Sequence, residues 1–277
     1  MTETTGRMVQ VTTFASEAAA ASWRKYAAAR DAYMAATTNR LLDMAGVGIG
    51  SRVLSLGVGT GGEAFEAAKR VGPSGHVVAT DLSPAMVAGA QAEAAAVGIT
   101  NIEFRVMDAQ HLDFPDGAFD AVTSRNVLMF VPDLAGALAE IKRVLRSPGR
   151  VGASVWSTGR RNPRIADPLV AARVLGAHVP GSATYQLAMR LARPSVLRVA
   201  LSQAGFTHIQ QQLVPLVAEY LSLDDAVDTA MDQPPTAELV ALLGADGDAR
   251  MRRALKRRWA KYGAHLPGEQ LVVGGAV

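Results

Sequence analysis

The stretch VLSLGVGTGG, residues 53–62, decides the fold class, because an apolar run leads directly into a loop with four glycines. Glycines that follow a strand let the backbone turn sharply and approach a ligand closely. Gly57, Gly59 and Gly62 fit G-x-G-x-x-G, the pattern of dinucleotide-binding loops. Gly57, Gly59 and Gly61 fit G-x-G-x-G, the loop of nucleoside-binding methyltransferases. The loop alone therefore leaves a hydride-transfer enzyme and a methyl-transfer enzyme open.

Strand and helix patterns alternate on either side of this loop. Apolar runs predict strands at 52–56, 76–80, 102–106, 119–124 and 150–156, and two later runs predict strands at 206–216 and 269–277. Helical patterns separate the first five, and Ser83 is expected to cap a helix that starts at Pro84. This alternation predicts an α/β fold with a doubly wound, mostly parallel sheet covered by helices on both faces.

Helical additions are expected around this core. Residues 14–45 and 222–262 have helical patterns, the second broken at DQPP, and residues 157–194 carry four prolines among short apolar runs. We therefore predict a single domain, 1–277. Its parts are a helical segment at 1–50, a cofactor-binding core at 51–156, a partly helical insertion at 157–194, and C-terminal strands with a helical insertion at 195–277.

Composition excludes several kinds of site and partner. The chain has 277 residues, a net charge of only +3 and no cysteine, which excludes disulfides, thiolate nucleophiles and cysteine zinc sites. No two of the five histidines have helical metal-ligand spacing, so we expect no metal. The first residues show no secretory signal and no run of 18 apolar residues occurs, so we expect a cytoplasmic protein without a membrane span.

A basic stretch, RMRRALKRRWAK at 250–261, is the only feature that suggests RNA. Aromatic residues make up just 5% of the chain, which leaves few platforms for stacking bases. We therefore expect a solvated helix face and no nucleic-acid partner, with an RNA methyltransferase as an alternative.

Two aspartates at strand ends favour the methyl-transfer reading of the glycine loop. Asp81 ends the second strand, where a carboxylate can accept hydrogen bonds from both ribose hydroxyls of either NAD or S-adenosylmethionine. Asp108 lies just past the third strand, where it could accept from an adenine amino group while the N–H of Ala109 donates to the ring. A dinucleotide enzyme has no general need for a carboxylate at this second position.

Together these segments resemble a class I S-adenosylmethionine-dependent methyltransferase of the ubiquinone/menaquinone-biosynthesis-like group (methyltransferase type 11). The matching segments are 52–87, 101–122, 124–151 and 154–163. The resemblance implies a Rossmann-like methyltransferase fold with seven strands, the last antiparallel, and S-adenosyl-L-methionine as cofactor. It also implies the cofactor-binding residues: Gly57, Gly59 and Gly61 at the methionine end, Asp81 at the ribose, Leu82 and Met86 on the adenine, Asp108 and Ala109 at the adenine edge, and the backbone of Ser124 and Arg125 beside the methionine moiety.

The chain departs from this group at Ser55, where the group usually has Asp or Glu. That acid helps to organise the loop and the ammonium end of the cofactor. Ser55 can form hydrogen bonds but carries no charge. This departure leaves open a protein that retains the cofactor for a non-methylating reaction such as cyclisation.

The expected function is S-adenosylmethionine-dependent transfer of a methyl group to an oxygen or carbon of a small molecule. We expect a bacterial secondary metabolite, a quinone or a lipid-like acceptor. The insertion at 157–194 is expected to form the acceptor lid, and its His178 and Tyr185 are weak candidates for a catalytic base. No sequence motif for that base is required, because the cofactor supplies most of the chemistry.

Overall fold

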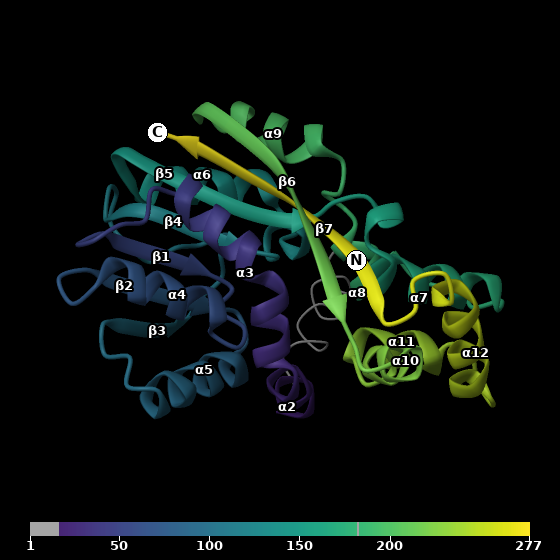
Figure 1. Cartoon of the computed structure of the whole chain (residues 1–277). Coiled ribbons are helices and arrows are strands. Elements are labelled where there is room, and N and C mark those ends of the chain that lie inside the picture. The colour runs from purple at the N-terminus through teal and green to yellow at the C-terminus, as the bar shows by residue number, and fades with distance from the viewer. Residues whose placement is uncertain (1–16, 182) are drawn as a thin grey trace.

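The computed structural model describes residues 17–181 and 183–277, and it contains a seven-stranded sheet with the order β3-β2-β1-β4-β5-β7-β6 (Figure 1). The strands are β1 (Arg52–Leu56), β2 (His76–Asp81), β3 (Ile102–Val106), β4 (Phe119–Arg125), β5 (Leu145–Trp156), β6 (Thr207–Glu219) and β7 (His265–Ala276). The pairs from β3 to β5 are parallel, and β7 is antiparallel to both of its neighbours, β5 and β6. The predicted fold class is confirmed, including the antiparallel last strand.

Helices surround the sheet and extend beyond it. They are α2 (Glu17–Lys25), α3 (Ala27–Met44), α4 (Gly62–Val71), α5 (Pro84–Ala96), α6 (Leu134–Val144), α7 (Pro163–Val174), α8 (Thr184–Ala188), α9 (Pro194–Gln203), α10 (Leu223–Met231), α11 (Pro234–Ala241) and α12 (Gly247–Trp259). The predicted cap is confirmed, since the Ser83 side chain accepts a hydrogen bond from the Met86 N–H and Pro84 begins α5. None of these helices, within 17–181 and 183–277, is long and apolar enough to cross a membrane.

The central strands are covered on both faces. Successive residues of a strand point to opposite faces, yet every residue from Val53 to Leu56 is buried. Helix α3 packs closely against one face, because a Cβ at Gly152 in β5 would lie 2.4 Å from the Leu41 carbonyl oxygen of α3. The glycines of β5 and β7 thus allow α3 to lie close to the sheet.

The additions form a second hydrophobic cluster with α7, α10, α11 and α12. Trp259 is fully buried there, and its indole N–H donates to the Asp167 carboxylate of α7 at 2.9 Å. The insertion is therefore partly helical, as predicted, and α10 and α11 are separated at the predicted break. Residues 1–16 of the expected N-terminal helical segment lie outside the described residues.

One boundary differs from the sequence-based expectation. The pattern LAGALAEIKRVLRS, residues 134–147, predicts a helix, but α6 ends at Val144 and β5 begins at Leu145, which pairs with Phe119 of β4. Pro148 prevents a helix through residue 147, because the residue before a proline, here Ser147, avoids helical backbone angles, and Leu145 already has the extended angles of a strand.

Candidate functional site

A cavity of about 430 Å³ lies at the carboxyl ends of β1, β2 and β4, where parallel α/β sheets bind ligands. Its walls come from the N-terminal helices, the glycine loop, the insertion and the C-terminal additions. Eight of the ten predicted cofactor residues line it: Gly57, Gly59, Asp81, Leu82, Met86, Asp108, Ala109 and Arg125. Gly61 and Ser124 do not line it. Ser124 is fully buried, and Gly61 caps the start of α4.

The glycine loop has the left-handed backbone that its sequence predicts. Gly57, Gly59 and Gly61 have φ angles of 71°, 52° and 95°. A Cβ at Gly57 would lie 2.2 Å from Val127, so that position requires glycine on steric grounds as well. A Cβ at Gly59 would have no described neighbour within 4 Å, so the loop there borders open cavity.

Asp81 connects the loop to the second strand. Its carboxylate accepts hydrogen bonds from the N–H groups of Gly59 and Ser83, each at 2.9 Å. A carboxylate has about four acceptor sites, so it has capacity left for ligand hydroxyls. Burial raises the pKa of the Asp81 carboxyl, and the backbone hydrogen bonds counteract that effect.

The other end of the cavity has a polar edge and an apolar wall. The Asp108 carboxylate accepts from the backbone N–H and the side-chain amide of Gln110, the latter at 3.0 Å to both oxygens. Leu82 is 47% exposed although it is a large apolar residue, and it lies beside buried Met86 on the cavity wall. Sequence reasoning missed Gln110, which lines the cavity next to Asp108.

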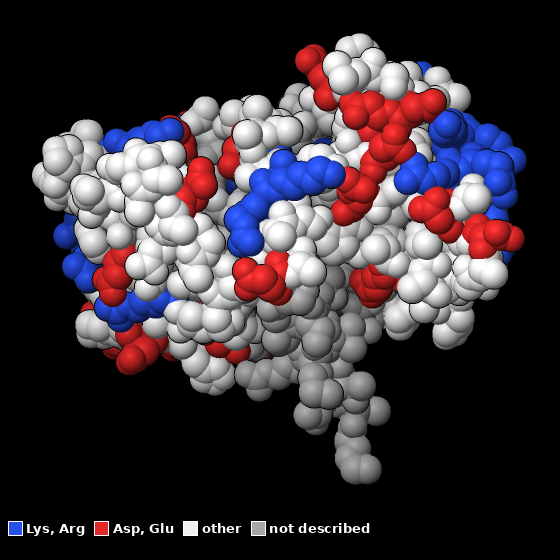
Figure 2. Space-filling view, turned by 90° about the horizontal axis from the view of Figure 1, so that it is seen from below, with Lys and Arg blue, Asp and Glu red and all other residues white. Residues whose placement is uncertain are grey.

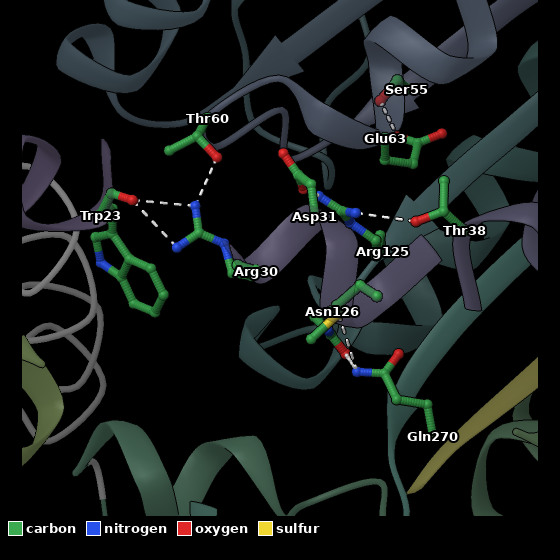
Figure 3. A network of polar contacts seen from close by, with 11 residues as sticks. Trp23, Arg30, Asp31, Thr38, Ser55, Thr60, Glu63, Arg125, Asn126 and Gln270 are labelled. Atoms are coloured by element: carbon green, nitrogen blue, oxygen red, sulfur yellow. Dashed lines mark hydrogen bonds and ion pairs between the residues drawn. The ribbon is translucent and has the colours of Figure 1, made fainter. Parts of the chain in front are cut away.

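Glu63 supplies a carboxylate next to Ser55. The Ser55 hydroxyl donates a hydrogen bond to Glu63 Oε2, and both side chains are buried (Figure 3). Glu63 Oε1 is buried without a hydrogen-bond partner among the described residues, and Glu63 lines the cavity. Burial raises the pKa of the Glu63 carboxyl, while hydrogen bonding to Ser55 and Thr123 and the charge of Arg125 oppose that shift. The carboxyl group that Ser55 lacks is therefore present on the first turn of α4.

The side chain of Arg30, on α3, contacts the glycine loop. Its guanidinium donates to the Trp23 carbonyl oxygen at 3.1 Å and to the Thr60 hydroxyl at 2.7 Å (Figure 3). Burial lowers the pKa of Arg30 to about 10, so it remains a cation at neutral pH. Sequence reasoning also missed this residue, because no motif marks it.

Arg125 and Asn126 at the end of β4 contact α3 and β7. Arg125 donates to the Asp31 carboxylate at 2.8 Å and to the Thr38 hydroxyl at 2.9 Å. Asn126 has a positive φ of 62°, an uncommon angle for a residue with a side chain, and its oxygen accepts from Gln270 at 3.0 Å. These contacts join the strand end to the helix that forms one cavity wall.

The two candidate bases lie in different environments. Tyr185 lines the cavity and is buried, its hydroxyl lies 3.1 Å from that of Thr236, and burial raises its pKa. His178 is exposed and does not line the cavity. The structure therefore brings Tyr185 to the cavity and leaves His178 away from it.

A polar contact ties α2 to the end of α10 beside the cavity. Asp232 accepts from Lys25 Nζ at 2.6 Å and from the Tyr26 hydroxyl at 2.7 Å, and its backbone oxygen accepts from Ser22 at 3.0 Å. Tyr26 also lines the cavity. The N-terminal helices and the C-terminal additions thus meet over one site.

Replacing Ser55 with aspartate is expected to destabilise the protein by about 3 kcal/mol, because a second carboxylate would be buried against Glu63. Chemical denaturation of wild type and the Ser55→Asp variant measures this loss. Adding Glu63→Gln is expected to restore most of the stability, since one carboxylate is then removed. Wild-type stability of the single variant would contradict the interpretation that the acid has moved to Glu63.

Comparisons with known proteins match the middle of the chain to one domain family. Residues 54–152 match the methyltransferase domain family. The chain is similar to nocamycin O-methyltransferase of Saccharothrix syringae, with 33% identity over 181 residues, 62% of this chain and 65% of that protein. It is also similar to aklanonic acid methyltransferase of Streptomyces sp. (strain C5), with 40% identity over 112 residues, 40% of this chain and 51% of that protein. Among solved structures, the [4+2]-cyclase SpnF shares the fold with a TM-score of 0.53 and 23% identity, over 86% of this chain and 79% of that one.

These matches confirm the resemblance to class I S-adenosylmethionine-dependent methyltransferases for residues 54–152, and they support S-adenosylmethionine as the cofactor. The chain spans about half to two thirds of the length of these two relatives. The activity and acceptor of the whole protein therefore remain proposals.

Proposed function

We propose that the protein transfers a methyl group from S-adenosylmethionine to an oxygen or carbon of a small, largely apolar acceptor. The observation that supports this proposal most is that a single cavity is lined by the glycine loop, Asp81 and Glu63 and also by residues of the insertion. Both named relatives are methyltransferases, and one is an O-methyltransferase. A secondary metabolite or quinone of several rings fits this proposal.

The chain's residues fit this cofactor along its whole length. Asp81 would accept from the ribose hydroxyls, and Leu82 with Met86 would pack on the adenine. Asp108 and the Ala109 N–H would meet the adenine edge. When bound, the cofactor supplies an activated methyl group on a sulfonium, and the protein contributes positioning and exclusion of water.

The amino-acid end of the cofactor is where Glu63 and Arg30 act. Glu63 Oε1 is a buried acceptor without a partner among the described residues, which is costly unless a ligand donor satisfies it. An ammonium group is such a donor, and Glu63 would hold it in place of the acid that Ser55 lacks. Arg30 is positively charged and contacts Thr60 of the glycine loop, so it would form an ion pair with the carboxylate of the cofactor.

The acceptor part of the cavity has walls from two separate segments. The insertion contributes Arg164, Ile165, Thr184, Tyr185 and Ala188. The end of β6 and the helical additions after it contribute Ala218, Glu219, Tyr220, Thr229, Ala230, Gln233 and Pro235. We propose that the insertion acts as the acceptor lid together with these additions, which the sequence did not link to the acceptor.

No observation favours an RNA acceptor over a small molecule. Basic side chains of α12 are paired with acids: Arg252 with Asp228 and Asp248, Lys256 with Asp224, and Arg258 with Asp167. At the end of the molecule where α12 lies, acidic side chains border the basic ones (Figure 2). This pairing leaves less free positive charge for phosphates.

The test is methyl transfer from S-adenosylmethionine with a radiolabelled methyl group to a panel of polycyclic phenols, quinols and carboxylic acids. We expect a labelled product and an equal amount of S-adenosylhomocysteine with at least one acceptor. Tight cofactor binding with no transfer to any acceptor would instead support the non-methylating alternative. A protein that binds neither S-adenosylmethionine nor S-adenosylhomocysteine would contradict the proposal.

A further inference from the structure

Arg164 lies between two aromatic rings on the cavity wall. It is the second residue of α7, and its guanidinium carbon lies 4.8 Å from the ring centre of Tyr33 and 5.7 Å from that of Tyr220. Tyr33 comes from α3 and Tyr220 directly follows β6, so residues far apart in sequence form this cluster. All three line the cavity.

Close packing fixes the position of this cluster. A Cβ at Gly268 of β7 would lie only 1.8 Å from the Tyr33 hydroxyl oxygen, so that hydroxyl rests directly on the strand. Both phenols interact with the Arg164 guanidinium, which partly offsets the rise in their pKa that burial causes. The guanidinium is therefore held in one place before any ligand binds, which reduces the entropy lost on binding.

Arg164 differs from the other arginines of the cavity in its partners. Arg125 forms an ion pair with Asp31, and Arg30 donates to a carbonyl oxygen and a hydroxyl. No carboxylate within 17–181 and 183–277 lies within 4.0 Å of the Arg164 guanidinium nitrogens, although Glu219 is on the same cavity wall. The positive end of the α7 helix dipole adds to this charge. A guanidinium of this kind favours an anionic ligand.

Apart from carboxylates such as that of Glu219, the lining offers no ordinary base for a neutral acceptor. The described lining residues include no histidine, lysine or cysteine. Burial raises the pKa of the three phenols Tyr33, Tyr185 and Tyr220, so at neutral pH they are hydrogen-bond donors and not bases. An acceptor oxygen that is already ionised has no proton to lose.

We propose that Arg164, with the hydroxyls of Tyr33 and Tyr220, binds an anionic oxygen group of the acceptor, either a carboxylate or a comparably acidic hydroxyl. The inference rests on the proposed function, because it assigns the acceptor half of the same cavity. It makes Arg164 a determinant of acceptor specificity. Cofactor affinity depends on other residues, so the two proposals can fail separately.

The experiment compares matched pairs of ligands in titration calorimetry with S-adenosylhomocysteine present: benzoate, 2-naphthoate and anthraquinone-2-carboxylate, each against its carboxamide. In wild type we expect at least one carboxylate to bind about tenfold more tightly than its amide or better, since hydrogen bonds to charged groups are the stronger ones. Arg164→Gln is expected to remove that preference, and Arg164→Lys to keep part of it.

Arg173→Gln is the matched control, because Arg173 lies on the exposed side of the same helix, where it contacts Gln186. It is expected to bind all six ligands as wild type does. No carboxylate preference in wild type, or the same preference in Arg164→Gln, would overturn the inference. Affinity for S-adenosylhomocysteine, measured first in each variant, should stay within about threefold, well below one tenfold step of 1.4 kcal/mol. If the wild-type protein did not bind S-adenosylhomocysteine, that result would instead contradict the proposed function.

Discussion

Replacing Asp81 with alanine is expected to weaken the binding of S-adenosylhomocysteine and of 5′-methylthioadenosine by about 10- to 100-fold. The carboxylate has two tasks that alanine cannot perform. It would accept hydrogen bonds from the ribose hydroxyls, which both ligands carry. It already accepts a hydrogen bond from the Gly59 N–H, with a nitrogen–oxygen distance of 2.9 Å. Its removal therefore costs ligand contacts and loosens the loop that borders the ligand.

Titration calorimetry with both ligands measures the effect. Asp113→Ala serves as the control, since Asp113 is exposed and does not line the cavity, and its affinities should match those of wild type. If Asp81→Ala bound both ligands as wild type does, Asp81 would not be a ribose ligand and the placement of the cofactor would be wrong.

Replacing Arg30 with methionine is expected to weaken S-adenosylhomocysteine by about 10- to 50-fold while leaving 5′-methylthioadenosine nearly unchanged. The second ligand has the same nucleoside but no amino-acid group. Arg30 contacts Thr60 of the glycine loop and carries a positive charge, so only the ligand with a carboxylate should lose affinity. The comparison separates a specific contact from a general loss of the loop's shape.

Arg24→Met on the neighbouring helix is the control, because Arg24 is exposed and does not line the cavity, and it forms an ion pair with Glu17 at the surface. Equal losses for both ligands in Arg30→Met would mean that Arg30 acts by holding Trp23 and Thr60 in place and not by binding the carboxylate.

The sequence predicted the parts of the site that depend on local structure. Gly57, Gly59, Asp81 and Asp108 all lie at or just after the carboxyl ends of strands, and the ends of adjacent parallel strands meet at one edge. A strand pattern followed by glycines or an aspartate is therefore enough to place these residues at the cavity.

Other residues reach the site through long-range packing and carry no motif. Arg30 and Tyr33 are at the cavity because α3 packs across the sheet, and Arg164 because α7 follows β5. One signal for Glu63 was present in the sequence. It lies on the apolar side of α4 with Ala64, Ala67 and Val71, where an acid is unusual and would offset the missing charge at Ser55.

The position of β7 between β5 and β6 determines when the site can form during folding. Within the described chain, β6 pairs only with β7, although it precedes β7 by dozens of residues, so it cannot join the sheet until the later strand has been made. The glycine loop and both aspartates belong to earlier strands that can pair among themselves. During synthesis β1 to β5 can therefore pair with one another while β6 is still unpaired, and the open edge of β5 is then exposed to aggregation. β7 also carries Gly268, which lies against the Tyr33 hydroxyl, so this part of the cavity wall depends on a strand that is synthesised after β6.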